Sequence, residues 1–303
     1  MEIYSRSYYE VVFERDFLKK TGTTFQDFFS EIMEKRYPGD FQRVRPWGKL
    51  GDRKNDGYLR SKRMLFQVYA PNKMKLADTL DKINEDFSGA LPYWEGHFDY
   101  WVFTHNSRQG LSGDVLKRLL ELEKEYPHLK FPNWGYEELK NELFSLADID
   151  IAAILGPAPS MRDVHNMGYA ELKIVLKHIS NKEPLLNQDI SPTPNKKISS
   201  NGFSPHVETL IRDSHIKAVL VEKFFTEYYD PEYGDKIAKA FNDKYLELKS
   251  QNTLPDNIFM KLQEFAGGAM RGSPKHEAAV LAVLAYLFER CDIFEKPRSG
   301  EES

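Results

Sequence analysis

Two stretches decide how this sequence folds: Gly51-Asp-Arg-Lys-Asn-Asp56-Gly-Tyr-Leu59 and Met64-Leu-Phe-Gln67-Val-Tyr-Ala70. Aromatic and β-branched residues in short runs, bounded by turn residues, are typical of strands. Pro71 ends the second run because proline cannot donate to a strand ladder. We therefore predict two neighbouring strands of a hairpin, with Asp56 at the start of one and Gln67 inside the other.

Helical and strand patterns alternate on both sides of this hairpin. A Thr23-Thr24 cap followed by apolar residues at helical spacing predicts a helix that ends near Tyr37. The expected elements, in order, are a helix at 24–37, strands at 41–47, 56–59 and 64–70, a helix at 74–87, a strand at 100–104, a helix at 115–126, an extended segment at 129–132 and a helix at 136–146. This order predicts an α/β layered domain.

The second half of the sequence is expected to be helical. A helix is predicted at 161–178, and the proline-rich stretch 181–205 has no apolar periodicity and is expected to be a linker. Amphipathic helices are predicted at 207–229, 234–250, 256–265 and 276–288. The expected domains are an α/β domain at 1–180, the linker, a helical partner-docking domain at 206–296 and a disordered tail at 297–303. The apolar faces of the helices either pack on each other as a bundle or contact a partner.

Length and composition bound the class of protein. The 303 residues predict two domains, and 41 % hydrophobic residues exclude a mostly disordered chain. The single cysteine, Cys291, cannot form an internal disulfide or a cysteine-based zinc site, which favours a reducing compartment. The N-terminus lacks the apolar region of a secretory signal, and the longest apolar run, 278–288, is too short to cross a bilayer. We expect a cytoplasmic protein with no membrane partner.

Several catalytic motifs are absent from the sequence. There is no GxxxxGK[ST], so the chain is not itself a P-loop ATPase, and there is no GxSxG or GxGxxG. The eight histidines show no paired spacing of the kind that binds zinc.

The charge is uneven along the chain. Residues 35–75 hold twelve Lys and Arg but only three Asp, a balance of +9 in a chain whose net charge is −4. A basic segment in an acidic protein predicts a surface that meets a polyanion such as DNA. The alternative is a hairpin whose charged edges are simply solvated.

Asp56 and Gln67 carry the predicted chemistry. On neighbouring strands, a carboxylate and an amide oxygen can converge on Mg²⁺ or Mn²⁺, and Glu31 on the preceding helix can add a carboxylate. A metal held in this way activates water and neutralises charge on a phosphate. Each residue also has a plain structural interpretation: Asp56 as a turn residue, Gln67 as a satisfied buried amide, and Glu31 as a solvated side chain.

Asp56, Gln67-Val-Tyr69 and the element order resemble the restriction-endonuclease-like, PD-(D/E)XK, nuclease core over about 24–144. The resemblance implies a metal-dependent nuclease that hydrolyses phosphodiester bonds of DNA, with Asp56, Gln67 and Glu31 as metal ligands. The family lysine falls on Tyr69, so it is either relocated, with Lys73, Lys75 and Lys62 as candidates, or lost. The basic residues expected to bind DNA are Arg43, Arg45, Lys49, Arg53, Lys54, Lys62 and Arg63.

If the lysine is lost, the chain is an inactive nucleic-acid-binding or scaffold subunit. Tyr58 and Tyr69 are then either packing residues or platforms on which a base stacks.

A second resemblance covers most of the chain. The strings Lys217-Ala-Val-Leu-Val-Glu222, Phe265-Ala-Gly-Gly268 and Cys291-Asp-Ile-Phe-Glu295 are similar to a C-terminal domain of ABC-three component systems, which are bacterial anti-phage or anti-plasmid operons. The N-terminal half of such proteins is similar to the strings Gly48-Lys-Leu-Gly-Asp52, Phe66-Gln-Val-Tyr-Ala-Pro71 and Leu155-Gly-Pro-Ala-Pro-Ser160. The resemblance implies two partners, a separate ABC-type ATPase and a small middle component. The C-terminal helices would contact these partners and the N-terminal domain would be the effector.

Overall fold

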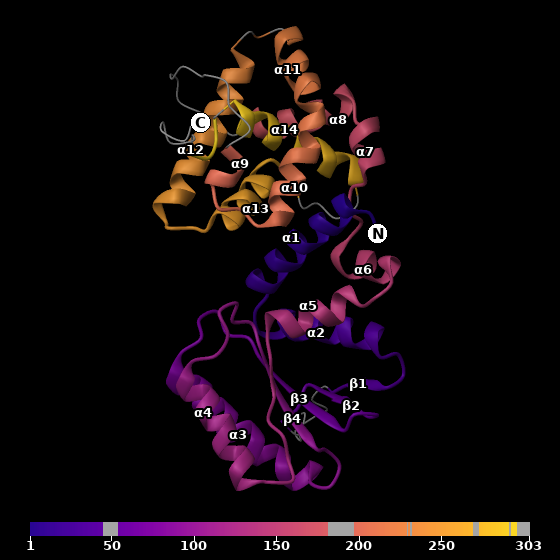
Figure 1. Cartoon of the computed structure of the whole chain (residues 1–303), viewed down its shortest axis with the longest axis vertical. Helices are drawn as coiled ribbons and strands as arrows, with labels where there is room; N and C mark the ends of the chain where they lie inside the picture. The colour runs from indigo at the N-terminus through magenta and orange to yellow at the C-terminus, as the bar shows by residue number, and fades with distance from the viewer. Residues whose placement is uncertain are drawn as a thin grey trace. The chain divides into compact units, whose positions relative to one another are not determined.

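The protein is described from a computed structural model, which covers residues 1–44, 54–180, 197–228, 230, 232–268, 273–290 and 292–295. Figure 1 shows the chain, which divides into two compact units. One, the α/β unit, is residues 16–154, and the other, the helical unit, combines residues 1–15 with 155–303. The predictions for Arg45, Lys49, Arg53, Cys291, most of the linker and the tail lie outside the described residues.

A five-stranded sheet organises the α/β unit (Figure 1). Its strands are β1 (Phe41–Arg43), β2 (Gly57–Leu59), β3 (Met64–Tyr69), β4 (Tyr100–His105) and β5 (Asn133–Trp134). They lie in the order in which they occur in the chain, with β1, β2 and β3 antiparallel and β3, β4 and β5 parallel. The predicted hairpin is confirmed, because Gly57 pairs with Phe66 and Leu59 with Met64.

Helices cover both faces of this sheet. The helices of the α/β unit are α2 (Gly22–Arg36), α3 (Leu76–Trp94), α4 (Gly113–Glu125), α5 (Tyr136–Phe144) and α6 (Asp148–Leu155). Leu65 and Phe103 form a core with residues of α3 and α4. Successive strand residues point to opposite faces, and Phe66 packs on Phe29 of α2, with 5.3 Å between ring centroids. Residues 65, 67 and 69 therefore face α3, and residues 64, 66 and 68 face α2.

The helical unit is built around one buried helix. Its elements are α1 (Ile3–Lys19), α7 (Met161–Asn166), α8 (Tyr169–Ser180), α9 (Lys197–Ser200), α10 (Pro205–Ser214), η2 (His215–Lys217), α11 (Ala218–Glu227), α12 (Tyr233–Ser250), α13 (Pro255–Phe265) and α14 (Pro274–Glu289). Every residue from 278 to 288 of α14 is buried. The longest apolar run of the sequence is thus the centre of this unit, and no helix among the described residues is long and apolar enough to cross a membrane.

Three helical predictions need correction. The helix at 161–178 is two helices, because Met167 adopts an extended conformation and Glu171 accepts a hydrogen bond from Gly168 N, 3.0 Å away. The helix at 207–229 is divided into α10, η2 and α11. The helix α1 was not expected at all. It places residues 1–15 in the helical unit, whereas the predicted domain limits placed them, and residues 155–180, with the sheet.

Candidate functional site

Asp56 lies directly before β2 and is fixed to β3 by two hydrogen bonds. Its backbone N–H donates to Phe66 O, 2.8 Å away, and its Oδ2 accepts from Val68 N at 2.7 Å. These partners flank Gln67 on either side, so Asp56 is held beside Gln67. The side chain is buried, with an exposed fraction of 8 %. The structure therefore brings together the first two predicted site residues.

Gln67 is buried on β3 and faces α3. Its exposed fraction is 5 %, and its Oε1 has no hydrogen-bond partner among the described residues. A buried amide oxygen that lacks a donor or a cation costs about 1–3 kcal/mol. No described residue satisfies the Gln67 oxygen, as the interpretation of a satisfied core amide would require.

Glu31 is not brought to this place. It is exposed on α2, and α2 covers the face of the sheet opposite to the one that Gln67 faces. The helical pattern predicted α2 correctly, but it does not say which face of the sheet the helix will cover.

The three lysines expected to replace the family lysine lie outside the strands. Lys62 is in the turn at the other end of the hairpin, where its Nζ contacts the Tyr37 hydroxyl at 3.2 Å. Lys73 and Lys75 are exposed between β3 and α3, and Lys75 Nζ lies 3.8 Å from the Asp78 carboxylate.

Tyr69, at the lysine position of the family pattern, is a packing residue. Its ring lies 6.1 Å from that of Phe103, and burial raises the pKa of its hydroxyl above the usual value. Lys82 on α3 acts electrostatically in the other direction and lowers that pKa. Lys82 is thus an α3 lysine whose charge acts on the Tyr69 hydroxyl.

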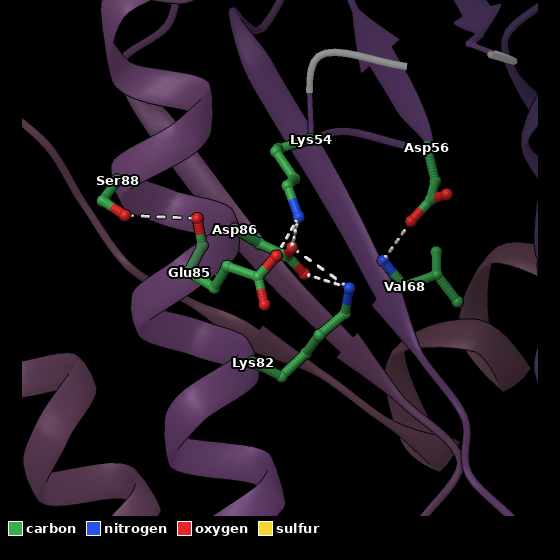
Figure 2. A network of polar contacts seen from close by, with 7 residues as sticks. All are labelled: Lys54, Asp56, Val68, Lys82, Glu85, Asp86 and Ser88. Carbon is green, nitrogen blue, oxygen red and sulfur yellow. Dashed lines mark hydrogen bonds and ion pairs between the residues drawn. The ribbon is translucent and has the colours of Figure 1, made fainter. Parts of the chain in front are cut away.

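A cluster of ion pairs lies on α3 beside the Asp56–Gln67 pair (Figure 2). Asp86 is fully buried, and its carboxylate is 2.9 Å from Lys82 Nζ and 3.4 Å from Lys54 Nζ. Lys54 also pairs with Glu85, which is exposed. Figure 2 shows both lysines directed toward these acids, while Asp56 is directed toward the Val68 backbone.

Burial and hydrogen bonding shift the pKa values of Asp86 and Lys54 in this cluster. Desolvation raises the pKa of the Asp86 carboxyl, and the two lysines oppose it only in part. The hydrogen bond to Glu85 raises the pKa of Lys54, which keeps its ammonium charged.

Among the described residues of the predicted DNA surface, Arg43, Lys54 and Arg63 are paired with acids. Arg43 lies 3.0 Å from both Asp27 and Glu34, and Arg63 lies 2.9 Å from Asp99. Together with Lys54 on Glu85 and Asp86, these contacts neutralise in space much of the positive charge that is clustered in the sequence.

Asp56 and Gln67 offer a metal ion a carboxylate and an amide oxygen, which is a small set of ligands. Within the described ranges, no three His, Cys, Asp or Glu side chains are placed to hold a metal ion together. The Asp56–Gln67 pair is not such a group, because it consists of one carboxylate and one amide.

Sequence reasoning missed Lys82 and Asp86, although a signal was present. Asp86 lies on the same stripe of α3 as the buried Thr79, Ile83 and Ala90, and Lys82 precedes it by one turn. An acid on the buried stripe of an amphipathic helix needs a charged partner, and a lysine four residues earlier can supply it.

Comparison with known proteins gives one match. No curated protein and no solved structure matches the chain. Residues 170–295, from α8 to the segment after α14, match the family model for C-terminal domain 10 of the ABC-three component (ABC-3C) systems. Systems of this kind contain further components. Over residues 170–295 the chain is thus similar to a C-terminal domain of the ABC-three component systems.

Proposed function

We propose that the α/β unit is a metal-dependent nuclease-like effector of an ABC-three component defence system and that it hydrolyses phosphodiester bonds of DNA. One observation carries the proposal: the buried Gln67 Oε1 lacks a partner beside the buried carboxylate of Asp56. The order of helix, three strands, helix and strand around this pair supports the restriction-endonuclease-like interpretation.

The side-chain oxygens of Asp56 and Gln67 are suitable ligands for a hard divalent cation. Mg²⁺ and Mn²⁺ prefer carboxylate, amide and water oxygens, and an amide oxygen without a donor is free to ligate. Asp56 and Gln67 would hold the ion, which when bound supplies an acidified water and neutralises charge on the scissile phosphate. Glu31 joins the set only if α2 moves, so we assign it no role as a ligand.

A lysine of α3 could supply an amine to the phosphate. The charge of Lys82 acts on Tyr69, and the buried Asp86 carboxylate lies 2.9 Å from the Lys82 Nζ. We therefore favour Lys82 over Lys73, Lys75 and Lys62 as the residue that stabilises negative charge at the phosphate.

The helical unit would connect this effector to the rest of the system. Its ABC-3C domain supports contacts with a separate ABC-type ATPase and a small middle component. The assay of the nuclease is therefore performed with and without these components.

The test is cleavage of plasmid and single-stranded DNA with Mg²⁺ or Mn²⁺. Asp56→Ala and Gln67→Leu are each expected to abolish cutting, and Lys82→Met to reduce it strongly. Asp99→Ala is the matched control, because Asp99 is a partly exposed acid that pairs with Arg63. Cutting that persists in Asp56→Ala, or the absence of metal-dependent cutting with all components present, would reject the nuclease proposal.

A second candidate is an inactive nucleic-acid-binding or scaffold subunit. Tyr69 at the lysine position favours it, because the aromatic ring packs on Phe103 and leaves no amine on that strand. Binding that weakens steeply with salt, survives Asp56→Ala and occurs without cutting would support this candidate, because phosphate contacts release counterions. Salt-insensitive behaviour would instead indicate an interaction module without a nucleic-acid role.

A further inference from the structure

Lys54 connects the chain entering β2 to α3 in an unusual way. Its backbone lies in the left-handed region, with φ of 60°, which a lysine rarely adopts. Its side chain crosses α3 at Gly89, where a Cβ would come within 2.8 Å of the Lys54 Cγ. Residues held in such conformations persist only where their surroundings fix them, and they are frequent at functional sites.

Lys54 Nζ pairs with the exposed Glu85 and also lies 3.4 Å from the fully buried Asp86, the one of the two acids that water does not screen. The carboxylate of Asp86 is shared with Lys82, so both ammonium groups are bound by one acid that has no access to water. Asp56 follows Lys54 by two residues and is bound to β3 through Val68 N. The segment is therefore fixed at two points, on α3 through Lys54 and on β3 through Asp56.

We propose that Asp86 is a positioning residue for the Asp56–Gln67 site: by anchoring Lys54 on α3, it sets where the Asp56 carboxylate lies on β3. The value of this role for metal binding rests on the proposed function, but the positioning itself does not. Asp86 does not touch the metal or the substrate in this scheme. Gly89 contributes to the same positioning, because it leaves room for the Lys54 side chain to cross α3.

The Val68 amide gives a direct readout of the Asp56 position, since its hydrogen bond ends on Asp56 Oδ2. Amide hydrogen exchange is measured by NMR on the full chain without metal. In Asp86→Asn, exchange at Val68 is expected to rise about tenfold relative to the other β3 amides, as for loss of a charge-assisted hydrogen bond. Glu85→Gln is the matched control, because Glu85 contacts the same lysine from an exposed position, and it should leave Val68 within about twofold.

Gly89→Ala tests the positioning of Asp56 through Lys54 without removing a charge. Alanine favours the helix more than glycine does, so this variant cannot act by loosening α3. It displaces the Lys54 stem, and Val68 exchange is expected to rise as in Asp86→Asn. If Asp86→Asn does not fold, Gly89→Ala decides the question. Unchanged Val68 exchange in Gly89→Ala would overturn the proposal, and so would unchanged exchange in a folded Asp86→Asn.

Calorimetry with Mn²⁺ separates this inference from the proposed function. If both are correct, wild type binds Mn²⁺, Asp56→Ala does not, and Asp86→Asn and Gly89→Ala bind about tenfold more weakly. Wild-type protein that fails to bind Mn²⁺ while Val68 exchange still responds to the variants would reject the metal site and retain the positioning role. Normal Mn²⁺ affinity in both variants, with Val68 unchanged, would reject the positioning role and retain the metal site.

Discussion

His105, at the end of β4, is a buried neutral imidazole. Ser107 N donates to its Nδ1 at 3.2 Å, which assigns the ring proton to Nε2. Burial lowers the pKa of His105 from 6.5 to about 4, against a smaller opposite effect of Glu138. Between these two values the unfolded chain binds a proton that the folded chain excludes. The free energy of unfolding of the α/β unit should therefore fall by about 3 kcal/mol as the pH is lowered from 6.5 to 4.

The measurement is urea unfolding across that pH range, followed by tryptophan fluorescence. His105→Gln should remove most of this pH dependence, whereas the exposed His128→Gln should keep it. An equal slope in wild type and His105→Gln would show that other groups cause the acid sensitivity.

At the scale of elements, Lys197 joins α9 to the end of α14. Its Nζ is buried and donates to Phe288 O at 2.7 Å and to Ile293 O at 2.6 Å. Carbonyl groups at a helix C-terminus lack intrahelical partners, and a cation there is also favoured by the helix dipole. We expect Lys197→Met to lower the stability of the helical unit by about 3 kcal/mol, measured by circular dichroism during urea unfolding.

The exposed Lys261→Met is the control for this substitution and should change stability by less than about 0.5 kcal/mol. If Lys197→Met unfolds at the same urea concentration as wild type, the buried ammonium does not stabilise the end of α14.

Elements that are buried on one face could be predicted from the sequence. Elements that are buried nearly all round could not. The hairpin β2–β3, with Asp56 beside Gln67, followed from strand runs bounded by turn residues. Helix α1 gave no periodic signal because its residues are buried nearly all round, from Tyr8 to Phe13. Glu31 was misplaced because an amphipathic helix does not specify the sheet face that it covers. Asp86 and Lys82 needed the packing of α3 on β3 before their proximity to the site could be seen.

At the scale of the whole molecule, residues 1–15 belong to a unit whose other members lie beyond residue 154. Tyr4 is buried there, and its hydroxyl lies 2.8 Å from Ser214 Oγ on α10. Tyr4→Ala should therefore lower the stability of the helical unit by about 3–5 kcal/mol, as for a buried aromatic truncation. The neighbouring Ile3 is 77 % exposed, so Ile3→Ala is the control.

The two units can be followed separately in this experiment. All four tryptophans lie between residues 47 and 134, within the α/β unit, so their fluorescence reports on that unit alone. We expect Tyr4→Ala to shift the circular dichroism transition of the helical unit and to leave the tryptophan transition in place. A shift of the tryptophan transition alone would contradict the assignment of residues 1–15 to the helical unit.

The shared membership of α1 also has a consequence during synthesis. Residue 3 leaves the ribosome about 200 residues before α10 begins, which at about 5–20 residues per second is a delay of roughly 10–40 s. During that interval the aromatic side chains of residues 3–15 lack α10, while the α/β unit, which lies between them in the sequence, can already fold. These side chains are thus open to chaperones until the rest of the helical unit has been translated.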